Sequence, residues 1–225
     1  MRKSIMWLLM SRCKYVLWDW NGTLLDDLQA NIDVGDRLLE KRGLPPIQSK
    51  EFYLENFCFP VLNFYKLIGI DLNDEEYRMI ATEYEQEYEQ RLKDTFLFDD
   101  VTKTLDRLNA SGFHQVIISA THEDTLLRQV ARYGIEDKFE RILGTANNLG
   151  ISKVQSALSW IEQNGINANE TVFIGDTTHD FETASAIGCK CMLVARGHNS
   201  KRRLIETGCE VFDNLNEVAG DLIRL

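Results

Sequence analysis

The stretch that decides the fold is YVLWDWNGTL, residues 15–24. Its first four residues are apolar and lack the polar alternation of a strand that has one face in solvent. The run is also too short for a helix. It therefore predicts a strand that is buried on both faces and ends at Asp19. Gly22 supplies backbone freedom where the chain turns away from this strand.

Three more short apolar runs have the same character. They lie at residues 116–118, 172–174 and 191–194. Between them apolar residues recur at helical spacing, as in Val101, Leu105 and Leu108. Strands that alternate with helices predict an α/β fold of the Rossmann-like type, in which helices cover both faces of a parallel sheet.

One segment interrupts this alternation, because residues 28–93 contain no convincing strand. Helical spacing marks residues 28–39, and a long acidic helix is predicted over about residues 74–93. We therefore predict a small all-helical cap domain at residues 26–95. The core domain is made of the remaining residues, 1–25 and 96–225. A one-sided stripe on the long helix has a spacing more typical of packing than of ligand binding. The stripe consists of Tyr77, Ile80, Tyr84, Tyr88 and Leu92.

The charge of the chain limits the classes of partner. Lysine and arginine total 25, aspartate and glutamate total 35, and the formal net charge is −10. A field of this sign repels nucleic acid and anionic membranes, so we expect neither as a partner. It also repels phosphate esters. A phosphate site would therefore need local positive charge, most simply a metal ion and a lysine.

The cysteines and the N-terminus bear on the compartment. The five cysteines are scattered and include no C-x-x-C pair, which fits reduced thiols in a cytoplasmic protein. Residues 1–10 faintly resemble a signal peptide, but their apolar run is very short and no small-residue cleavage site follows. The run is also too short to span a bilayer. We expect an N-terminal extension ahead of the fold. The sequence gives no indication of oligomeric state.

Polar side chains follow each predicted strand at the point where it ends. In an open parallel sheet, ligands bind beyond the carboxyl ends of the strands, so these side chains should meet at one rim. They are Asp19 and Thr23 after the first strand, Ser119 after the second, Asp176 and Asp180 after the third, and Arg196 after the fourth. Lys153 stands at a predicted helix start. Clustered carboxylates suit Mg²⁺, and a carboxylate can also act as a nucleophile. A lysine and a hydroxyl can hold the oxygens of a phosphoryl group.

These residues carry a family resemblance. Residues 19–23, DWNGT, resemble the first motif, D-x-D-G-T, of phosphatases in the haloacid dehalogenase superfamily. Ser119, Lys153 and the run from Gly175 to Asp180 resemble the second, third and fourth motifs. The layout is similar to that of phosphoglycolate phosphatases and β-phosphoglucomutases. The resemblance implies a Mg²⁺-dependent hydrolase that acts on a small phosphorylated metabolite through an aspartyl-phosphate intermediate.

The resemblance also implies a role for each matched position. Asp19 would attack phosphorus, and Lys153 would offset its charge. The implied metal ligands are Asp19, Asn21 through its backbone carbonyl, Asp176 and, directly or through water, Asp180. The implied substrate-binding residues are Thr23, which helps to fix the loop, and Ser119, Ala120 and Lys153, which meet the phosphoryl oxygens.

Asn21 departs from the family pattern, which has an aspartate there that protonates the leaving group and later activates water. An amide cannot do this, and the loss typically costs about 10²–10⁴ in rate. Turnover would survive with a surrogate such as His122 or His179, or with a good leaving group. Otherwise the protein would be a slow or non-catalytic descendant that binds a phosphorylated ligand. Asn21 could also be an engineered substitution, or could deamidate to aspartate beside Gly22.

Two sibling chemistries offer further alternatives. Phosphonate hydrolases of the superfamily also lack the second aspartate and use a cap lysine, for which the candidates are Lys41, Lys50 and Lys66. Dehalogenases need no metal, whereas the fourth motif here resembles a metal-binding one. We favour phosphomonoester hydrolysis, although the sequence does not identify the ester. Four aromatic residues of the cap are candidates to line the substrate space, although packing in a core explains their presence equally well. They are Phe57, Phe59, Phe64 and Tyr65.

Overall fold

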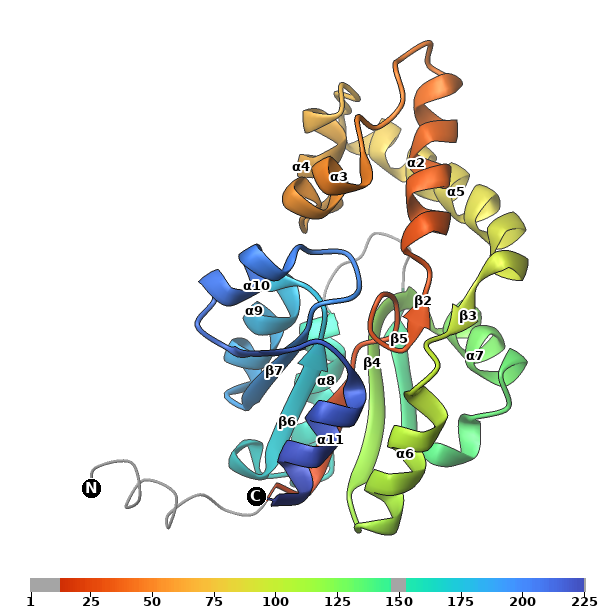
Figure 1. Cartoon of the computed structure of the whole chain (residues 1–225). Coiled ribbons are helices and arrows are strands. Elements are labelled where there is room, and N and C mark those ends of the chain that lie inside the picture. The colour runs from red at the N-terminus through yellow and green to blue at the C-terminus, as the bar shows by residue number, and fades with distance from the viewer. Residues whose placement is uncertain (1–12, 147–152, 225) are drawn as a thin grey trace.

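The computed structural model of the chain describes residues 13–146 and 153–224 (Figure 1). The predicted N-terminal extension, residues 1–10, lies outside the described residues. No helix in the described part of the chain is both long enough and apolar enough to cross a membrane.

The core is built on a sheet of six parallel strands in the order β5-β4-β1-β6-β7-β8. The strands are β1 (Tyr15–Trp18), β4 (His114–His122), β5 (Arg141–Thr145), β6 (Thr171–Gly175), β7 (Lys190–Val194) and β8 (Glu210–Phe212). The predicted α/β class with a parallel sheet is confirmed. The four strands predicted from apolar runs are the four central ones, whereas the sequence analysis predicts neither edge strand.

Helices cover both faces of the sheet. They are α6 (Val101–Ala110), α7 (Glu123–Arg132), α8 (Lys153–Gln163), α9 (Thr178–Ile187), α10 (Lys201–Glu206) and α11 (Leu215–Arg224), with the short turns η3 (Glu136–Lys138) and η4 (Ala168–Glu170). On β1, Val16 and Trp18 join an apolar cluster with α6, α7 and α11. Leu17 joins a second cluster with α8 and α9. All three side chains are fully buried, which is why this strand has no polar alternation.

The chain leaves the core after β1 and returns through a two-stranded antiparallel ribbon, β2 (Leu25–Asp26) with β3 (Phe96–Leu97). Between these strands lie the helices α2 (Leu28–Glu40), α3 (Lys50–Asn56), α4 (Val61–Leu67) and α5 (Asp74–Arg91), and the turn η2 (Leu92–Asp94). They pack around an apolar cluster of their own. Figure 1 shows this insert over the carboxyl ends of the strands. The predicted helical insert is confirmed, and the domain limits at residues 26–95 stay a prediction.

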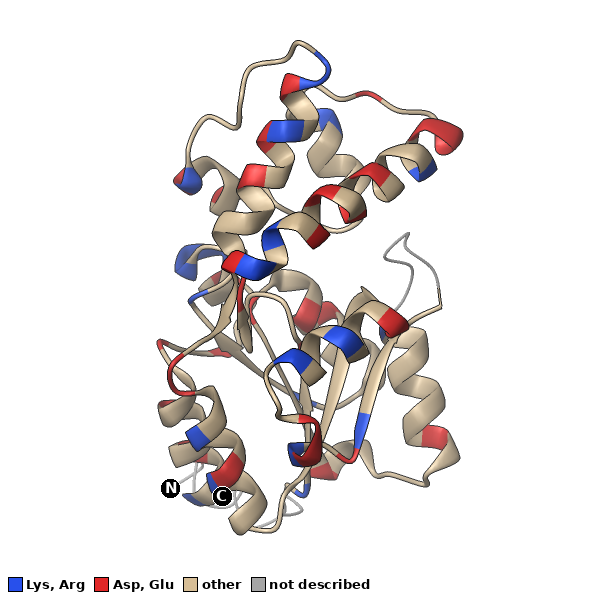
Figure 2. Cartoon of the chain, turned by 90° about the vertical axis from the view of Figure 1, so that its right-hand side faces the viewer, with Lys and Arg blue, Asp and Glu red and all other residues tan. Residues whose placement is uncertain are grey.

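The long cap helix α5 begins with a capping box. Asn73 accepts a hydrogen bond from the backbone N–H of Glu76, whose carboxylate accepts one from the backbone N–H of Asn73. Acidic residues continue along α5, as Figure 2 shows. Ile80 and Tyr88 of the predicted stripe are buried in the cap cluster, so the predicted packing role is confirmed.

Candidate active site

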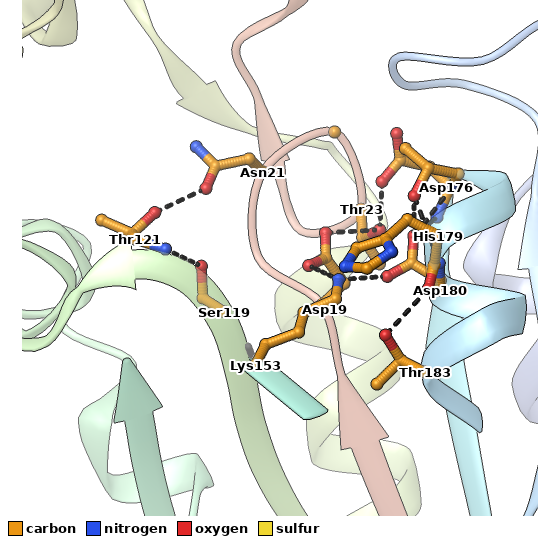
Figure 3. Close-up of polar contacts among 12 residues, drawn as sticks. Asp19, Asn21, Thr23, Ser119, Thr121, Lys153, Asp176, His179, Asp180 and Thr183 are labelled. Carbon is orange, nitrogen blue, oxygen red and sulfur yellow. Dashed lines mark hydrogen bonds and ion pairs between the residues drawn. The ribbon is translucent and has the colours of Figure 1, made fainter. Parts of the chain in front are cut away.

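Three aspartates meet beyond the carboxyl ends of two neighbouring strands (Figure 3). Asp19 follows β1, Asp176 follows β6, and Asp180 lies in the first turn of α9. All three are buried, and one carboxylate oxygen of each lies within 4.8 Å of the others. Burial, with help from the neighbouring carboxylates, raises the pKa of Asp19 well above its usual range. Burial and the Asp180 charge likewise raise the pKa of Asp176 to about 6, against the opposing effect of His198.

This cluster fits a divalent metal ion. Carboxylates that share a dry site repel one another, and a cation placed among them removes that repulsion. Hard oxygen ligands are the ones that Mg²⁺ prefers. Burial, together with repulsion among the carboxylates, raises the pKa values of Asp19 and Asp176, and a bound cation would oppose both effects. The described residues therefore provide the three carboxylates of the predicted donor set.

Lys153 supplies positive charge beside the aspartates. It begins α8, and its Nζ lies 2.9 Å from Asp19 Oδ1 and also pairs with Asp180 Oδ1. Its side chain is only 3% exposed. Burial by itself lowers the pKa of Lys153, but the two carboxylates outweigh this and raise it. Lys153 is thus a permanently charged group next to the Asp19 carboxylate.

Thr23 and Gly22 hold the loop after β1 against Asp176. The Thr23 hydroxyl lies 2.7 Å from Asp176 Oδ1 and 3.3 Å from Asp19 Oδ2. Gly22 has a φ of +73°, and a Cβ there would come within 2.4 Å of Asp176 Oδ2. Only glycine combines this conformation with so close an approach.

Ser119 and Ala120 reach the same rim from β4. The buried Ser119 Oγ accepts a hydrogen bond from the backbone N–H of Thr121 at 3.1 Å, so its hydroxyl proton can point to a ligand. Ser119, Ala120 and Lys153 line a cavity of about 1020 Å³ that extends from Asp19 to the cap. The structure thus brings together the predicted metal-binding and substrate-binding residues, whereas Arg196, predicted at the same rim, does not line the cavity. The roles assigned to these residues stay proposals.

A model of the family described as haloacid dehalogenase-like hydrolase matches residues 16–194 of this chain. The chain belongs to this family. It is 21% identical over 194 residues to a phosphoglycolate phosphatase of Aliivibrio fischeri, covering 83% of this chain and 86% of the relative. It is 26% identical over 215 residues to a phosphoglycolate phosphatase of Pseudomonas fluorescens, covering 90% and 77%. The predicted family is confirmed.

Solved structures agree on the fold. The crystal structure of a predicted phosphatase from Clostridium acetobutylicum matches with a TM-score of 0.82 at 18% identity, covering 96% of this chain and all of that one (100%). A predicted phosphoglycolate phosphatase from Haemophilus somnus matches with a TM-score of 0.75 at 18% identity, covering 94% and 99%. At such identities these likenesses define the fold only. The substrate of this hydrolase must be inferred from its own site.

In this hydrolase, Asn21 is held by a set of contacts that suits an amide. Its Nδ2 donates to Asp27 Oδ2 at 2.8 Å and to the Tyr88 hydroxyl at 3.0 Å. Its Oδ1 accepts a hydrogen bond from the Thr121 hydroxyl at 2.8 Å. The donor and acceptor ends of the amide are therefore each matched, which fixes the orientation of the side chain.

Asp27 and His198 belong to this site, and the sequence analysis misses both. Asp27 is fully buried at the start of α2, and His198 lies on the loop after β7, where its Nε2 is 3.1 Å from Asp27 Oδ1. Burial lowers the pKa of His198, but the Asp27 carboxylate outweighs it and raises that pKa to about 9. His198 stands only two residues beyond Arg196, so reading further past that strand end would have found it. Asp27 follows β2, which is too short to give an apolar run.

The other charged candidates do not reach the cluster. Arg196 pairs with Asp100 at 2.6 Å and donates to the Thr23 carbonyl, so it binds protein groups instead of facing the cavity. His122 lines the cavity, whereas His179 pairs with Glu182 and stacks on a cap phenylalanine. The candidate Schiff-base lysines are exposed, and none lines the cavity among the described residues. These lysines are Lys41, Lys50 and Lys66.

Proposed function

We propose that this hydrolase cleaves phosphomonoesters through an aspartyl-phosphate formed on Asp19. The observation that carries the proposal is the buried contact of Lys153 with Asp19 at the floor of a cavity, beside Asp176 and Asp180. An isolated buried carboxylate is a poor nucleophile because it is protonated, and the charge of Lys153 opposes this by favouring the ionised form of Asp19. Ser119 offers a hydroxyl to the phosphoryl oxygens.

The metal site completes this proposal. Asp19, Asp176 and the backbone carbonyl of Asn21 would hold Mg²⁺, with Asp180 supporting them directly or through water. When bound, the ion neutralises negative charge on the transferring group. Asp180 also accepts hydrogen bonds from the backbone N–H and the hydroxyl of Thr177, which orient it.

The reaction would proceed in two steps. A carboxylate oxygen of Asp19 attacks phosphorus, the bond to the ester oxygen breaks, and the electron pair leaves with that oxygen. Water then attacks the aspartyl-phosphate, releasing inorganic phosphate and restoring Asp19. Asn21 cannot supply the proton in the first step or remove it in the second. Ester oxygens that leave readily as anions are therefore favoured.

A matched set of assays tests the proposed function. Phosphate release from an aryl phosphate and from phosphoglycolate, which the names of the relatives suggest, is measured with Mg²⁺ and with chelator. We expect Mg²⁺-dependent turnover of the aryl ester, and its loss in Asp19→Asn. Turnover that is insensitive to chelator or to Asp19→Asn would overturn the proposal.

The second candidate is a protein that binds a phosphorylated ligand without turning it over. The locked amide of Asn21 favours it, because the position of the general acid is filled by a group that cannot transfer protons. Saturable binding of inorganic phosphate without hydrolysis of either ester would support this candidate.

A further inference from the structure

We infer that the ligand of this site carries a bulky, uncharged aromatic group on its phosphate, and this inference rests on the proposed function. The first observation is size. The cavity measures about 1020 Å³, at the upper end of the range for pockets that enclose drug-sized ligands. A two-carbon acid such as glycolate would leave most of this volume unfilled. The cavity therefore suits a ligand several times larger.

The second observation is the chemistry of the cap wall. Aromatic side chains from α3, α4, α5 and the loop between α3 and α4 line the cavity. They are Tyr53, Phe57, Phe59, Phe64, Tyr65, Tyr77, Tyr84 and Tyr88. All four of the aromatic residues that the sequence marks as candidates are among them, and so are three tyrosines of the α5 stripe. The stripe thus packs in the cap and lines the cavity at once.

The polar ends of several of these rings are already bound. The Tyr53 hydroxyl pairs with His198 Nδ1 at 3.1 Å, and the Tyr88 hydroxyl donates to Asp27 Oδ2 at 2.5 Å. The Tyr84 hydroxyl donates to Asn31. These tyrosines consequently offer ring carbon to the cavity. Ring surfaces pack best against another aromatic group in offset or edge-to-face contact.

The third observation is charge. Lys153 and Arg128 are the only lysine or arginine among the described residues that line the cavity. Lys153 is paired with aspartates at the floor, and Arg128 is exposed. The cap wall contributes Glu85 and Glu89 from the acidic helix α5 (Figure 2). At the cap wall a carboxylate on the leaving group would thus face Glu85 and Glu89, and the buried cations Lys153 and His198 are already paired with aspartates.

The fourth observation is a single unpaired donor. Gln129 is 3% exposed, and its Oε1 accepts a hydrogen bond from Trp20 Nε1 at 2.7 Å, which fixes the amide orientation. Its Nε2 has no hydrogen-bond partner among the described residues, and the side chain lines the cavity. A buried donor left without an acceptor costs about 1–3 kcal/mol. The Nε2 atom is itself buried, so a neutral oxygen of the ligand would satisfy it only after the neighbouring side chains move aside.

An aromatic group also suits the chemistry at Asn21. An aryl ester loses its leaving group as a phenolate, which carries the electron pair of the broken bond and later takes a proton from water. Phenolates leave far more easily than alkoxides, so the missing general acid at residue 21 matters less.

Binding measurements test this inference separately from turnover. The probes are two non-hydrolysable phosphonates, 1-naphthylmethylphosphonate and the carboxylate 3-phosphonopropionate, titrated calorimetrically with Mg²⁺ present. We expect the naphthyl compound to bind at least tenfold more tightly. Equal affinity, or tighter binding of the carboxylate, overturns the inference even if aryl esters are hydrolysed. Failure of Asp19→Asn to abolish hydrolysis would instead count against the proposed function and leave this comparison standing.

A pair of α5 variants locates the aromatic group. Tyr77→Ala removes a half-buried ring from the cavity wall. The matched control is Met79→Ala, because Met79 lies on the same helix and is 67% exposed. We expect Tyr77→Ala to weaken the naphthyl compound about fivefold or more and to leave 3-phosphonopropionate unchanged. Met79→Ala should change neither. Equal losses for both probes in Tyr77→Ala would show that the cap wall does not discriminate an aromatic group from a carboxylate and would overturn the inference.

Discussion

The side-chain amide of Asn21 donates a hydrogen bond of 2.8 Å to the buried carboxylate of Asp27. Asp27 accepts four further hydrogen bonds in addition to this one. They come from the Gly22 backbone, His198, Asn31 and Tyr88. Every lone pair of Asp27 is therefore committed to a donor. The amide at position 21 supplies a hydrogen to Asp27. An ionised carboxylate at position 21 would have no hydrogen to donate and would face the Asp27 carboxylate directly.

Asn21→Asp should destabilise this hydrolase, because a half-buried carboxylate would lie within hydrogen-bonding distance of the fully buried Asp27 carboxylate. We expect a loss on the order of 3 kcal/mol in the free energy of unfolding, the cost of a buried charge without a partner. Exchanging the groups in Asn21→Asp/Asp27→Asn restores one donor and one acceptor between the two positions, but it removes the carboxylate that pairs with His198, so we expect it to recover only part of that loss. Urea unfolding at pH 7.5 of the three proteins measures both effects. Full stability of the single variant would show that Asp27 does not repel a carboxylate at position 21.

The same exchange separates the two candidate functions. In the single variant, repulsion by Asp27 favours a protonated or displaced Asp at position 21, so we expect little gain in hydrolysis of an alkyl phosphate. In the double variant the acid faces an amide, and alkyl phosphate turnover should rise by up to about 10²–10⁴, the usual contribution of a general acid and base. Aryl phosphate turnover should rise less. No gain in the folded double variant would mean that residue 21 is not what limits turnover.

The position of the aspartate cluster could be predicted from sequence because its residues follow strands of a parallel sheet. Asp19, Ser119 and Asp176 each end an apolar run, and parallel strands place such ends side by side. The edge strand β8 is only three residues long, and no residue in it is fully buried, so it has no apolar run to find. The contact of Asp27 with His198 joins residues 171 positions apart. Asp27 directly follows the two-residue strand β2, and His198 lies on the loop after β7. No local periodicity encodes that contact, and only the folded chain shows it.

His198 should make the stability of the fold depend on pH in a defined direction. Its pKa is raised from 6.5 to about 9, so its stabilising contribution is fully present below pH 6.5 and is lost as the pH rises through 9. This rise corresponds to roughly 3 kcal/mol. We expect the difference in unfolding free energy between wild type and His198→Gln to be largest near pH 6 and to shrink towards pH 10. Urea unfolding across this range measures the difference.

A double-mutant cycle assigns this pH dependence to the pair. With Asp27→Asn as the background, His198 loses the carboxylate that outweighs the effect of its burial. The pH-dependent difference caused by His198→Gln should then largely disappear. A difference of unchanged size in that background would show that Asp27 is not the partner that matters.

Magnesium should stabilise the protein, and its affinity should fall in acid. Asp176 has a pKa raised to about 6, so below that pH the ion must displace a proton from this carboxylate before it can bind. We expect Mg²⁺ to raise the thermal midpoint at pH 7.5, and chelator to reverse the effect. The dissociation constant from calorimetry should rise about tenfold for each pH unit below 6 for each proton displaced. Asp176→Asn, which removes a proposed ligand and this proton together, should lose the Mg²⁺-dependent stabilisation. An affinity that stays constant from pH 7.5 to pH 5 would place the ion away from Asp176, because binding there cannot avoid competition with the proton.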